Sequence, residues 1–333
     1  MQLPIGKINS SKEMLDFILP SIEKEVRQKI QKLKKSQMEY LKRIRESEKT
    51  RMLFFSKKVS EELKQITKSF PNIDKLSPFY KELVDANIGI TDLKKSWSRL
   101  NWAMTKIEEL RKKFLKELNK TNKSTEMNKI RKAFYGRAAS ILKSIDKELR
   151  FLESARKKFR SFPSVKQIKT IVLAGYPNVG KTSLLKVITG SEPEINSYPF
   201  TTKGIKVGFV RKNKKRVLQI IDTPGMLDRP LKKRNKIEMQ SILALKHLAE
   251  KIFFVMDVTS SCGYTLDEQL NLYEEVKKLF KEKEILLIVN KSDLISNKVV
   301  LKKLPKHVLI SASNMLSGKT SKEKLNKLLG IEN

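Results

Sequence analysis

The chain has 333 residues, of which 39% are hydrophobic, so it is long enough for roughly two domains with buried cores. Its 71 lysine and arginine residues against 36 acidic ones give a formal net charge of +35, which favours polyanionic partners, nucleic acid first. One cysteine, Cys262, excludes an intrachain disulfide, and two histidines leave little for a histidine-based metal site. Since neither a long apolar run nor a signal-peptide pattern is present, we expect a cytoplasmic protein without membrane attachment.

The first part of the chain, from about residue 10 to about residue 161, has a helical pattern almost throughout. Apolar residues recur there at three- and four-residue steps, as in the run Trp97, Leu100, Met104, Ile107, Leu110, Phe114 and Leu118. Breaks fall at residues 70–78, 87–89 and 119–124. The spacing predicts an antiparallel bundle of three or four long helices, with a short helix around residues 79–86.

Basic residues dominate the outer faces of these predicted helices, as in the run Arg111, Lys112, Lys113 and Lys116. Charge runs on helices are usually only solvated faces, but the bias to one sign here favours a surface that follows a phosphate backbone. Trp97 and Trp102 could stack on bases, although helical spacing favours core packing for them.

After residue 164 the pattern changes to short apolar strands that alternate with helical stretches, which predicts an α/β domain with a mostly parallel sheet. We expect strands at 170–174, 204–211, 217–222, 252–258, 285–290 and 308–311, and helices at 182–189, 236–249, 266–280 and 322–329. The charged turn at 212–215 predicts a hairpin, and so one antiparallel strand at an edge of the sheet. The predicted domains are therefore a basic helical bundle over 1–163 and an α/β domain over 164–333.

One motif organises the second domain. The stretch Gly175-Tyr176-Pro177-Asn178-Val179-Gly180-Lys181-Thr182 reads G-x-x-x-x-G-K-T between an apolar strand and a helix, which is the context of a phosphate-binding P-loop. Backbone N–H groups and the positive end of the new helix converge there on a phosphate chain. Lys181 adds positive charge for the β- and γ-phosphates, and the Thr182 hydroxyl can ligate Mg²⁺.

Further elements follow at the carboxyl ends of predicted strands, where ligands bind in open α/β sheets. In Asp222-Thr223-Pro224-Gly225, the carboxylate can hold Mg²⁺ through water and the Gly225 N–H can reach a γ-phosphate. Asn290-Lys291-Ser292-Asp293 matches the guanine-recognition pattern N-K-x-D. Asp293 can accept from guanine N1–H and the exocyclic amine, whereas adenine would leave this acceptor unpaired, so GTP is selected over ATP.

The remaining residues of this pattern have supporting roles. Lys291 can cover the base plane with its stem, Asn290 can tie this loop to the P-loop, and a backbone N–H in Ser311-Ala312-Ser313 can meet guanine O6. Between the P-loop and Asp222, a hydroxyl of Tyr198-Pro199-Phe200-Thr201-Thr202, preferably that of Thr202, could close on Mg²⁺ and the γ-phosphate.

The expected catalytic residues are Lys181, Thr202 and Gly225, and the expected metal ligands are Thr182, Thr202 and Asp222. The full predicted nucleotide-binding set comprises Gly175, Pro177, Asn178, Val179, Gly180, Lys181, Thr182, Ser183, Phe200, Thr201, Thr202, Asp222, Gly225, Asn290, Lys291, Asp293, Ser311, Ala312 and Ser313.

These motifs resemble the Obg branch of translation-factor-related P-loop GTPases, and most closely the NOG family of nucleolar GTP-binding proteins and their archaeal relatives. The resemblance is carried by 174–182, by Tyr198 to Lys203, by Asp222 to Pro230, by Arg234-Asn235 with 237–240, and by Cys262-Gly263-Tyr264. An N-terminal helical domain before an Obg-type GTPase domain also fits the family. Eukaryotic members carry a long extension that has no counterpart up to Asn333, so its functions cannot be carried over.

The resemblance implies a GTP- and Mg²⁺-dependent switch in large ribosomal subunit assembly, docking on ribosomal RNA through the helical domain. It implies ribosomal RNA and the large-subunit precursor as partners, and a monomer away from the ribosome. Two alternatives stay open: an RNA-binding scaffold with a mainly structural nucleotide, and an Obg-like regulator of another RNA partner.

Two residues bear on the rate of hydrolysis. Met226 stands where Ras-like enzymes place the glutamine that orients the attacking water, so intrinsic hydrolysis should be slow. Asn178 resembles the P-loop asparagine of K⁺-activated GTPases, although ordinary turn chemistry explains it equally well. Arg229, Arg234, Glu238 and Gln240 follow the second switch and could stabilise it, contact RNA or supply a catalytic group, although solvent-facing helix positions are the default for Glu238 and Gln240.

Overall fold

The computed structural model describes residues 6–34, 39–163, 165–166, 168–196, 204–231, 234, 236–296, 298–321 and 323–329. The chain divides into two compact units, of which the first, the helical unit, comprises Gln2–Lys75 and Ile88–Arg160. The second, the sheet unit, comprises Leu76–Asn87 and Ser161–Asn333. The short segment 76–87 thus belongs with the sheet, although it lies between helices of the bundle in the sequence.

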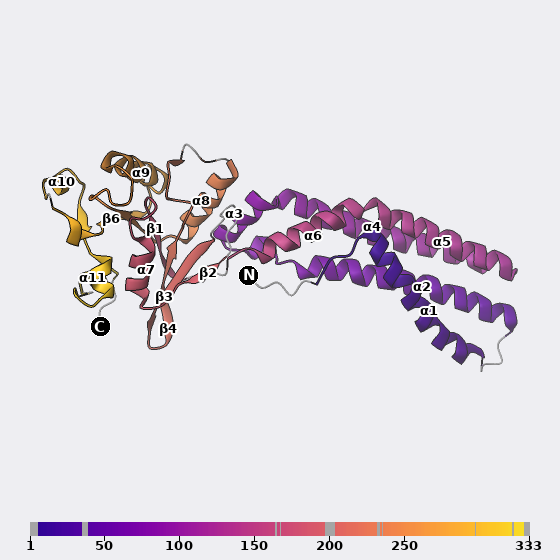
Figure 1. The fold of residues 1–333 in the computed structure, drawn as a ribbon. Coiled ribbons are helices and arrows are strands. Elements are labelled where there is room, and N and C mark those ends of the chain that lie inside the picture. The colour runs from indigo at the N-terminus through magenta and orange to yellow at the C-terminus, as the bar shows by residue number, and fades with distance from the viewer. Residues whose placement is uncertain are drawn as a thin grey trace. The chain divides into compact units, whose positions relative to one another are not determined.

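The helical unit contains α1 (Ser11–Lys34), α2 (Tyr40–Ser69), α4 (Ile90–Lys120), α5 (Ser124–Ser144) and α6 (Asp146–Arg160). Helix α2 packs against α1, α4 and α5, and α4 also packs against α6 (Figure 1). This confirms the predicted N-terminal helical domain. The described part of this unit has five helices, more than the expected three or four long ones. The reason is that the final helical stretch is interrupted at Ile145, which separates α5 from α6.

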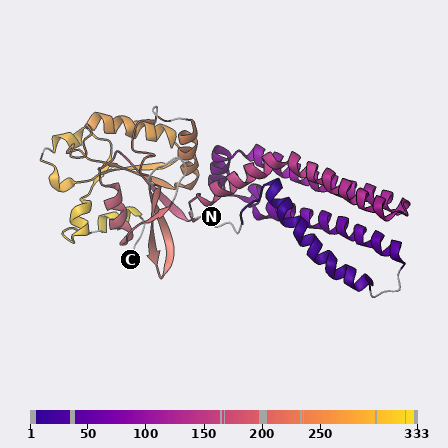
Figure 2. The same cartoon turned by 45° about the vertical axis from the view of Figure 1, so that its right-hand side comes forward.

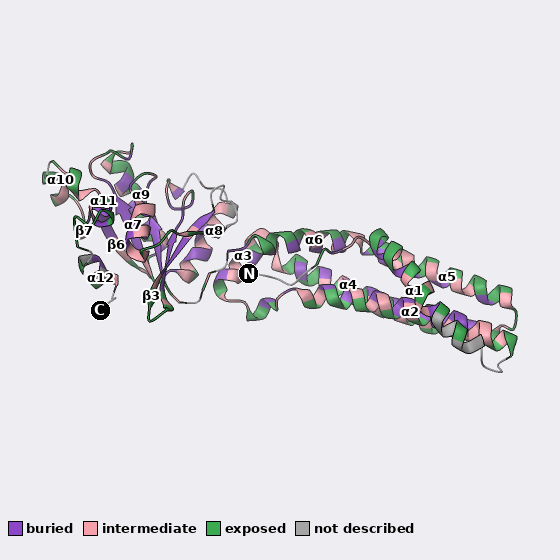
Figure 3. Ribbon diagram, turned by 60° about the horizontal axis from the view of Figure 1, so that its bottom comes forward, coloured by how far each residue is buried: buried purple, intermediate pink, exposed green. Residues whose placement is uncertain are grey.

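The core of the helical unit consists of the apolar stripes that the periodicity predicts. Figure 3 shows buried positions recurring along each helix, with exposed positions between them. At the centre the Phe55 and Phe134 rings meet edge to face, with centroids 5.7 Å apart. Trp97 packs on Phe70, as its spacing predicts, whereas Trp102 is 37% exposed and carries the Arg99 guanidinium 4.3 Å above its ring.

The sheet unit is built on seven strands: β1 (Lys169–Ala174), β2 (Glu194–Asn196), β3 (Ile205–Lys212), β4 (Lys215–Asp222), β5 (Lys251–Met256), β6 (Glu284–Val289) and β7 (His307–Leu309). Their spatial order is β2-β3-β4-β1-β5-β6-β7. Pairings from β4 through β1, β5 and β6 to β7 are parallel, and β3 is antiparallel to both of its neighbours. The predicted mixed, mostly parallel sheet is confirmed.

The edge of the sheet differs from the prediction in one respect. The antiparallel strand of the hairpin, β3, lies one position inside the edge, because β2 pairs beyond it with Ile195 opposite Lys206. Strand β2 has only three residues, which is too short for an alternating apolar pattern that would predict it.

The helices that follow β1 in the sheet unit are α7 (Lys181–Thr189), α8 (Lys236–Leu248), α9 (Leu266–Leu279), α10 (Val299–Lys302), α11 (Ala312–Leu316) and α12 (Glu323–Leu329). Within this unit they flank both faces of the sheet (Figures 1 and 2), and α7 packs on β3 and β4. None of the helices in the described part of the chain is both long and apolar enough to cross a membrane.

Helix α3 (Pro78–Asn87) packs against α8. Its Phe79, Leu83 and Val84 side chains are buried. The Tyr80 hydroxyl donates to the Pro163 carbonyl at 2.8 Å and accepts from the Val165 N–H at 3.2 Å, which joins α3 to the segment that leads into β1. The short helix predicted at 79–86 is therefore present, and it completes the surface of the sheet unit.

Candidate functional site

The P-loop follows β1 and ends as α7 begins, with Gly180 immediately before the first helical residue at a φ of 96°. A Cβ on Gly180 would lie 2.1 Å from the Nδ2 of Asn290, so glycine is required there both by the backbone conformation and by the close approach. The loop is also tied to the segment after β4, since the Gly175 N–H donates to the Leu227 carbonyl at 2.8 Å.

Lys181 is buried at the first position of α7, with 7% of its surface exposed. Its Nζ donates to the carbonyls of Gly175 and Tyr176, both at 2.7 Å. Burial lowers the pKa of Lys181, and the negative charges of Asp222 and Asp228 oppose that shift. The ammonium is thus held inside the loop with two carboxylates acting on it.

Thr182 and Asp222 come together as the predicted metal ligands, with the Thr182 Oγ1 donating to the Asp222 Oδ2 at 2.6 Å. Asp222 is 1% exposed, and its Oδ1 is buried without a hydrogen-bond partner. A divalent cation would satisfy this orphaned oxygen, so the donor set fits Mg²⁺. No group of three or more histidine, cysteine or acidic residues suited to a metal occurs among the described positions.

Lys206, which the sequence analysis did not select, lies at this corner. It sits opposite Asp222 in the β3–β4 register, and its Nζ donates to the Thr182 Oγ1 at 3.1 Å. The hairpin prediction contained the necessary signal, because pairing the two strands brings Lys206 next to the carboxylate.

The segment after β4 is fixed by one buried arginine. The Arg234 guanidinium, 1% exposed, donates to the carbonyls of Gly225 at 2.6 Å and Met226 at 2.7 Å. It also pairs with Asp228 at 3.1 Å and with Glu238 at 3.7 Å. Of the three roles considered for this residue, stabilisation of the loop is the one these contacts support.

The predicted base-recognition loop meets the P-loop through Asn290, which is 3% exposed. Its Nδ2 donates to the Val179 carbonyl at 2.9 Å, and its Oδ1 accepts from the Ala312 N–H at 3.0 Å. The Ser311 hydroxyl donates to the Asp293 carboxylate. One asparagine therefore links the phosphate loop with both segments expected to contact the base.

Lys291 has a left-handed backbone (φ 57°), and its Nζ donates to the Asp257 Oδ2 and the Ser261 Oγ, both at 2.8 Å. Burial of Asp257 would raise the pKa of its carboxyl, but hydrogen bonds from Lys291, Thr259 and Ser261 outweigh it, so the pKa is lowered. Asp257 was not predicted, although it directly follows the buried strand β5 as Asp222 ends β4.

Other predicted residues occupy varied positions. Asn178 is exposed with a left-handed φ of 61°, which asparagine tolerates, and Ser183 is half-buried in α7. Pro177 is half-buried and Ser313 exposed at their loops. Phe200, Thr201 and Thr202, predicted as the switch, lie outside the described residues.

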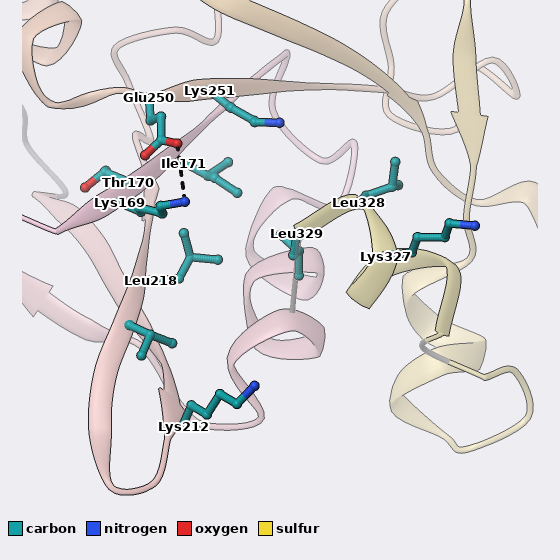
Figure 4. Close-up of a pocket in the computed structure, with 11 residues that line it drawn as sticks. Lys169, Thr170, Ile171, Lys212, Leu218, Glu250, Lys251, Lys327, Leu328 and Leu329 are labelled. Atoms are coloured by element: carbon teal, nitrogen blue, oxygen red, sulfur yellow. Dashed lines mark ion pairs between the residues drawn. The ribbon is translucent and has the colours of Figure 1, made fainter. Parts of the chain in front are cut away.

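A pocket of about 620 Å³ lies elsewhere in the sheet unit. It is lined by the first residues of β1 and β5, Lys169 and Lys251, and by Lys327 to Leu329 of α12 (Figure 4). Lys169 approaches Glu250 there at 4.0 Å. These positions are at the amino ends of the parallel strands, so the pocket is separate from the P-loop edge.

Two family models match the chain. The model of the NOG1 N-terminal helical domain matches residues 6–166, and the model of nucleolar GTP-binding protein 1 matches residues 236–293. An uncharacterised protein of Methanocaldococcus jannaschii is 45% identical over 242 residues, which are 73% of this chain and 67% of that protein. Nucleolar GTP-binding protein 1 of Eremothecium gossypii is 33% identical over 295 residues, 87% of this chain and 44% of that protein.

A solved structure of a Plasmodium falciparum protein named for nucleolar GTP-binding protein 1 is also similar, with 31% identity and a TM-score of 0.38 over 51% of this chain and 97% of that one. The chain aligns with less than half the length of the fungal relative. The matched N-terminal helical domain, the matched GTP-binding segment and the archaeal relative together place this chain in the NOG1 family.

Proposed function

We propose that the protein binds GTP and GDP with Mg²⁺ at the carboxyl ends of β1, β4, β6 and β7. The observation that carries the proposal is the double hydrogen bond of Asn290 to Val179 and Ala312, over a glycine that admits no side chain. It draws the phosphate loop and the base loop into one site. The Asp293 carboxylate then selects guanine, and Thr182 with Asp222 holds the cation.

We further propose slow GTP hydrolysis. Lys181, the Gly225 N–H and Thr202 would stabilise charge on the γ-phosphate, and Mg²⁺ would offset the charge that develops as the bond breaks. Met226 is 3% exposed and carries no group that could orient a water. Asn178 would help to hold a K⁺ ion beside the phosphates, in which case hydrolysis is faster in K⁺ than in Na⁺; equal rates in the two salts would remove the K⁺ component alone.

Family membership supports a role as a nucleotide-dependent assembly factor of the large ribosomal subunit, with the helical unit on ribosomal RNA. Lys112, Lys116 and Lys120 of α4 are exposed and lie four residues apart, so they share one side of the helix. We call these three residues the α4 lysine row. Evenly spaced cations of this kind suit a phosphate backbone.

The nucleotide proposal is tested by titrating the full chain with fluorescent GTP, GDP and ATP, and by repeating the titration with Asp293→Asn. We expect binding of both guanine nucleotides, no saturable ATP binding, and roughly 10- to 100-fold weaker GTP binding by the variant. The Asp267→Asn change, at an exposed position of α9, is the matched control. Unchanged GTP affinity in Asp293→Asn would mean that the base binds elsewhere.

The switch and the scaffold alternative differ in one measurement. Sedimentation of the protein with large ribosomal subunits is compared in the presence of a non-hydrolysable GTP analogue, GDP, or no nucleotide. A switch requires different affinities for the two nucleotide states. Equal binding in all three conditions would favour the scaffold, and no binding to subunits would favour an Obg-like regulator of another RNA.

A further inference from the structure

The carboxylate of Asp228 occupies a position that bears on the γ-phosphate. Its Oδ2 accepts a hydrogen bond from the Gly225 N–H at 2.6 Å. This N–H is the donor that the proposed function assigns to the γ-phosphate of GTP. One N–H directed at a carboxylate cannot at the same time make a full hydrogen bond to a phosphate oxygen, so the two anions compete for it.

Arg234 holds the Asp228 carboxylate in place. Its Nη2 donates to the Asp228 Oδ1 at 3.1 Å, while the same guanidinium binds the carbonyls of Gly225 and Met226. The guanidinium is 1% exposed, and burial lowers the pKa of Arg234 while Asp228 and Glu238 act against that shift. The acceptor and the peptide that donates to it are therefore fixed by one buried side chain.

We propose that Asp228 is a specificity-determining residue that stands in for the γ-phosphate and sets the preference of the site for GDP over GTP. The inference rests on the proposed function. A γ-phosphate must displace the carboxylate from the Gly225 N–H and brings further negative charge next to it, whereas GDP requires neither. Arg234 is a positioning residue in this scheme, because it holds Asp228 and the Gly225 peptide.

The test measures the ratio of the dissociation constants for fluorescent GDP and a fluorescent non-hydrolysable GTP analogue, in the full chain and in Asp228→Ala. Since hydrogen bonds that involve a charged group contribute about 1.5–3 kcal/mol, removal of the carboxylate should shift the ratio toward the GTP analogue by roughly tenfold or more. GDP affinity itself should change little. Asp267→Ala, an exposed carboxylate in the first turn of α9, should leave the ratio unchanged.

Asp228→Asn separates charge from shape and guards against misfolding of the alanine variant. Its amide oxygen can still accept from Gly225, but the negative charge is gone, so the ratio should move in the same direction by a smaller factor. If the unaltered chain binds both nucleotides and neither variant shifts the ratio, Asp228 is only a local turn residue and the inference is wrong. If the unaltered chain binds no guanine nucleotide, the proposed function fails first and the inference falls with it.

Discussion

The two units differ in the hydrogen-bond partners of their buried polar groups. In the helical unit, buried hydroxyls bond within their own helix, as Ser56 does to the Met52 carbonyl at 3.0 Å and Ser96 to the Asp92 carbonyl at 2.8 Å. In the sheet unit, Asn290 reaches Val179 across 111 positions of sequence, and Lys181, Asp222 and Asp257 are buried at the ends of strands or loops. A hydroxyl that bonds to the preceding turn of its own helix satisfies its donor without joining distant segments, whereas a hydrogen bond between distant segments brings the residues of a site together.

The proposed nucleotide chemistry lies in the sheet unit, and the proposed RNA contact lies in the helical unit. The buried positions of the helical unit (Figure 3) are mostly apolar. One exception is Glu48 of α2, which is 6% exposed and pairs with the Arg131 Nε at 2.6 Å and with Arg51 at 3.6 Å. The first three of the following experiments each alter one unit and measure the other as well, and the fourth concerns the helical unit alone.

The largest effect is expected from Glu48→Ala. Burial raises the pKa of Glu48 against the opposing charges of Arg131 and Arg51, so its removal leaves two poorly solvated cations. Urea denaturation should show a loss of about 3 kcal/mol in unfolding free energy, while nucleotide affinity at low urea is unchanged. Glu46→Ala, which breaks a half-exposed pair with Lys49, is the control and should cost less than about 1 kcal/mol. Equal losses in both variants would contradict a buried ion pair.

Next is Gly180→Ala in the P-loop. The added Cβ would meet the Asn290 Nδ2 at 2.1 Å, in a backbone conformation that already disfavours a side chain. GTP affinity should fall by about 100-fold, since the shared hydrogen bonds of Asn290 are displaced as well as the loop. Gly263→Ala isolates the conformational cost, because Gly263 has a φ of 88° with nothing within 4 Å of the added atom. RNA binding should survive both changes, and its loss in Gly180→Ala would show that the units are not separable.

Replacement of the three lysines of the α4 lysine row by glutamate alters the helical unit and tests whether RNA binding is lost while nucleotide binding is kept. RNA affinity should fall by roughly tenfold or more, and the slope of log affinity against log salt should decrease by roughly 2–3, because each lost phosphate contact releases one counterion fewer. Nucleotide affinity should be unaffected. A matched triple change at Lys277, Lys278 and Lys281 around the end of α9 controls for net charge. An equal loss from that control would mean that overall charge, and not this row, drives binding.

The smallest effect concerns pH. Hydrogen bonds from Arg150, then from Ser11, lower the pKa of Asp146 to about 2, below its ordinary value of 3.8. The ionised form is therefore favoured in the folded helical unit, and its contribution is present above about pH 4 and lost as pH falls toward 2. Partial exposure screens the pair, so we expect about 1 kcal/mol in acid denaturation curves. Asp146→Asn should flatten this part of the curve, and Asp74→Asn, at an exposed carboxylate, should leave it as it is.

The sequence predicts the elements well where a period or motif is long. The run from Trp97 to Leu118 marks α4, and the P-loop marks the end of β1 and the start of α7. Residues whose importance depends on distant partners escape prediction. Lys206 belongs to no motif, and it is the β3–β4 pairing that brings it to Thr182. Asp228 lies only three residues after Gly225, but the motif there gives no sign that its carboxylate accepts from the Gly225 N–H. Helix α3 is amphipathic whichever unit it joins, so its periodicity cannot reveal that it packs on α8.

The placement of α3 has a consequence for how the chain matures during synthesis. Residues 76–87 emerge from the ribosome long before α8, whose surface they cover, because α8 begins at Lys236. Until then the helix against which α3 packs has not been made. Within the described residues the chain also crosses between the units at 75/76, 87/88 and 160/161, so no single cut there yields two intact pieces. Residues 164–333 made alone would expose the α8 surface that α3 covers and should be prone to aggregation, a defect that adding a peptide of residues 76–87 should relieve.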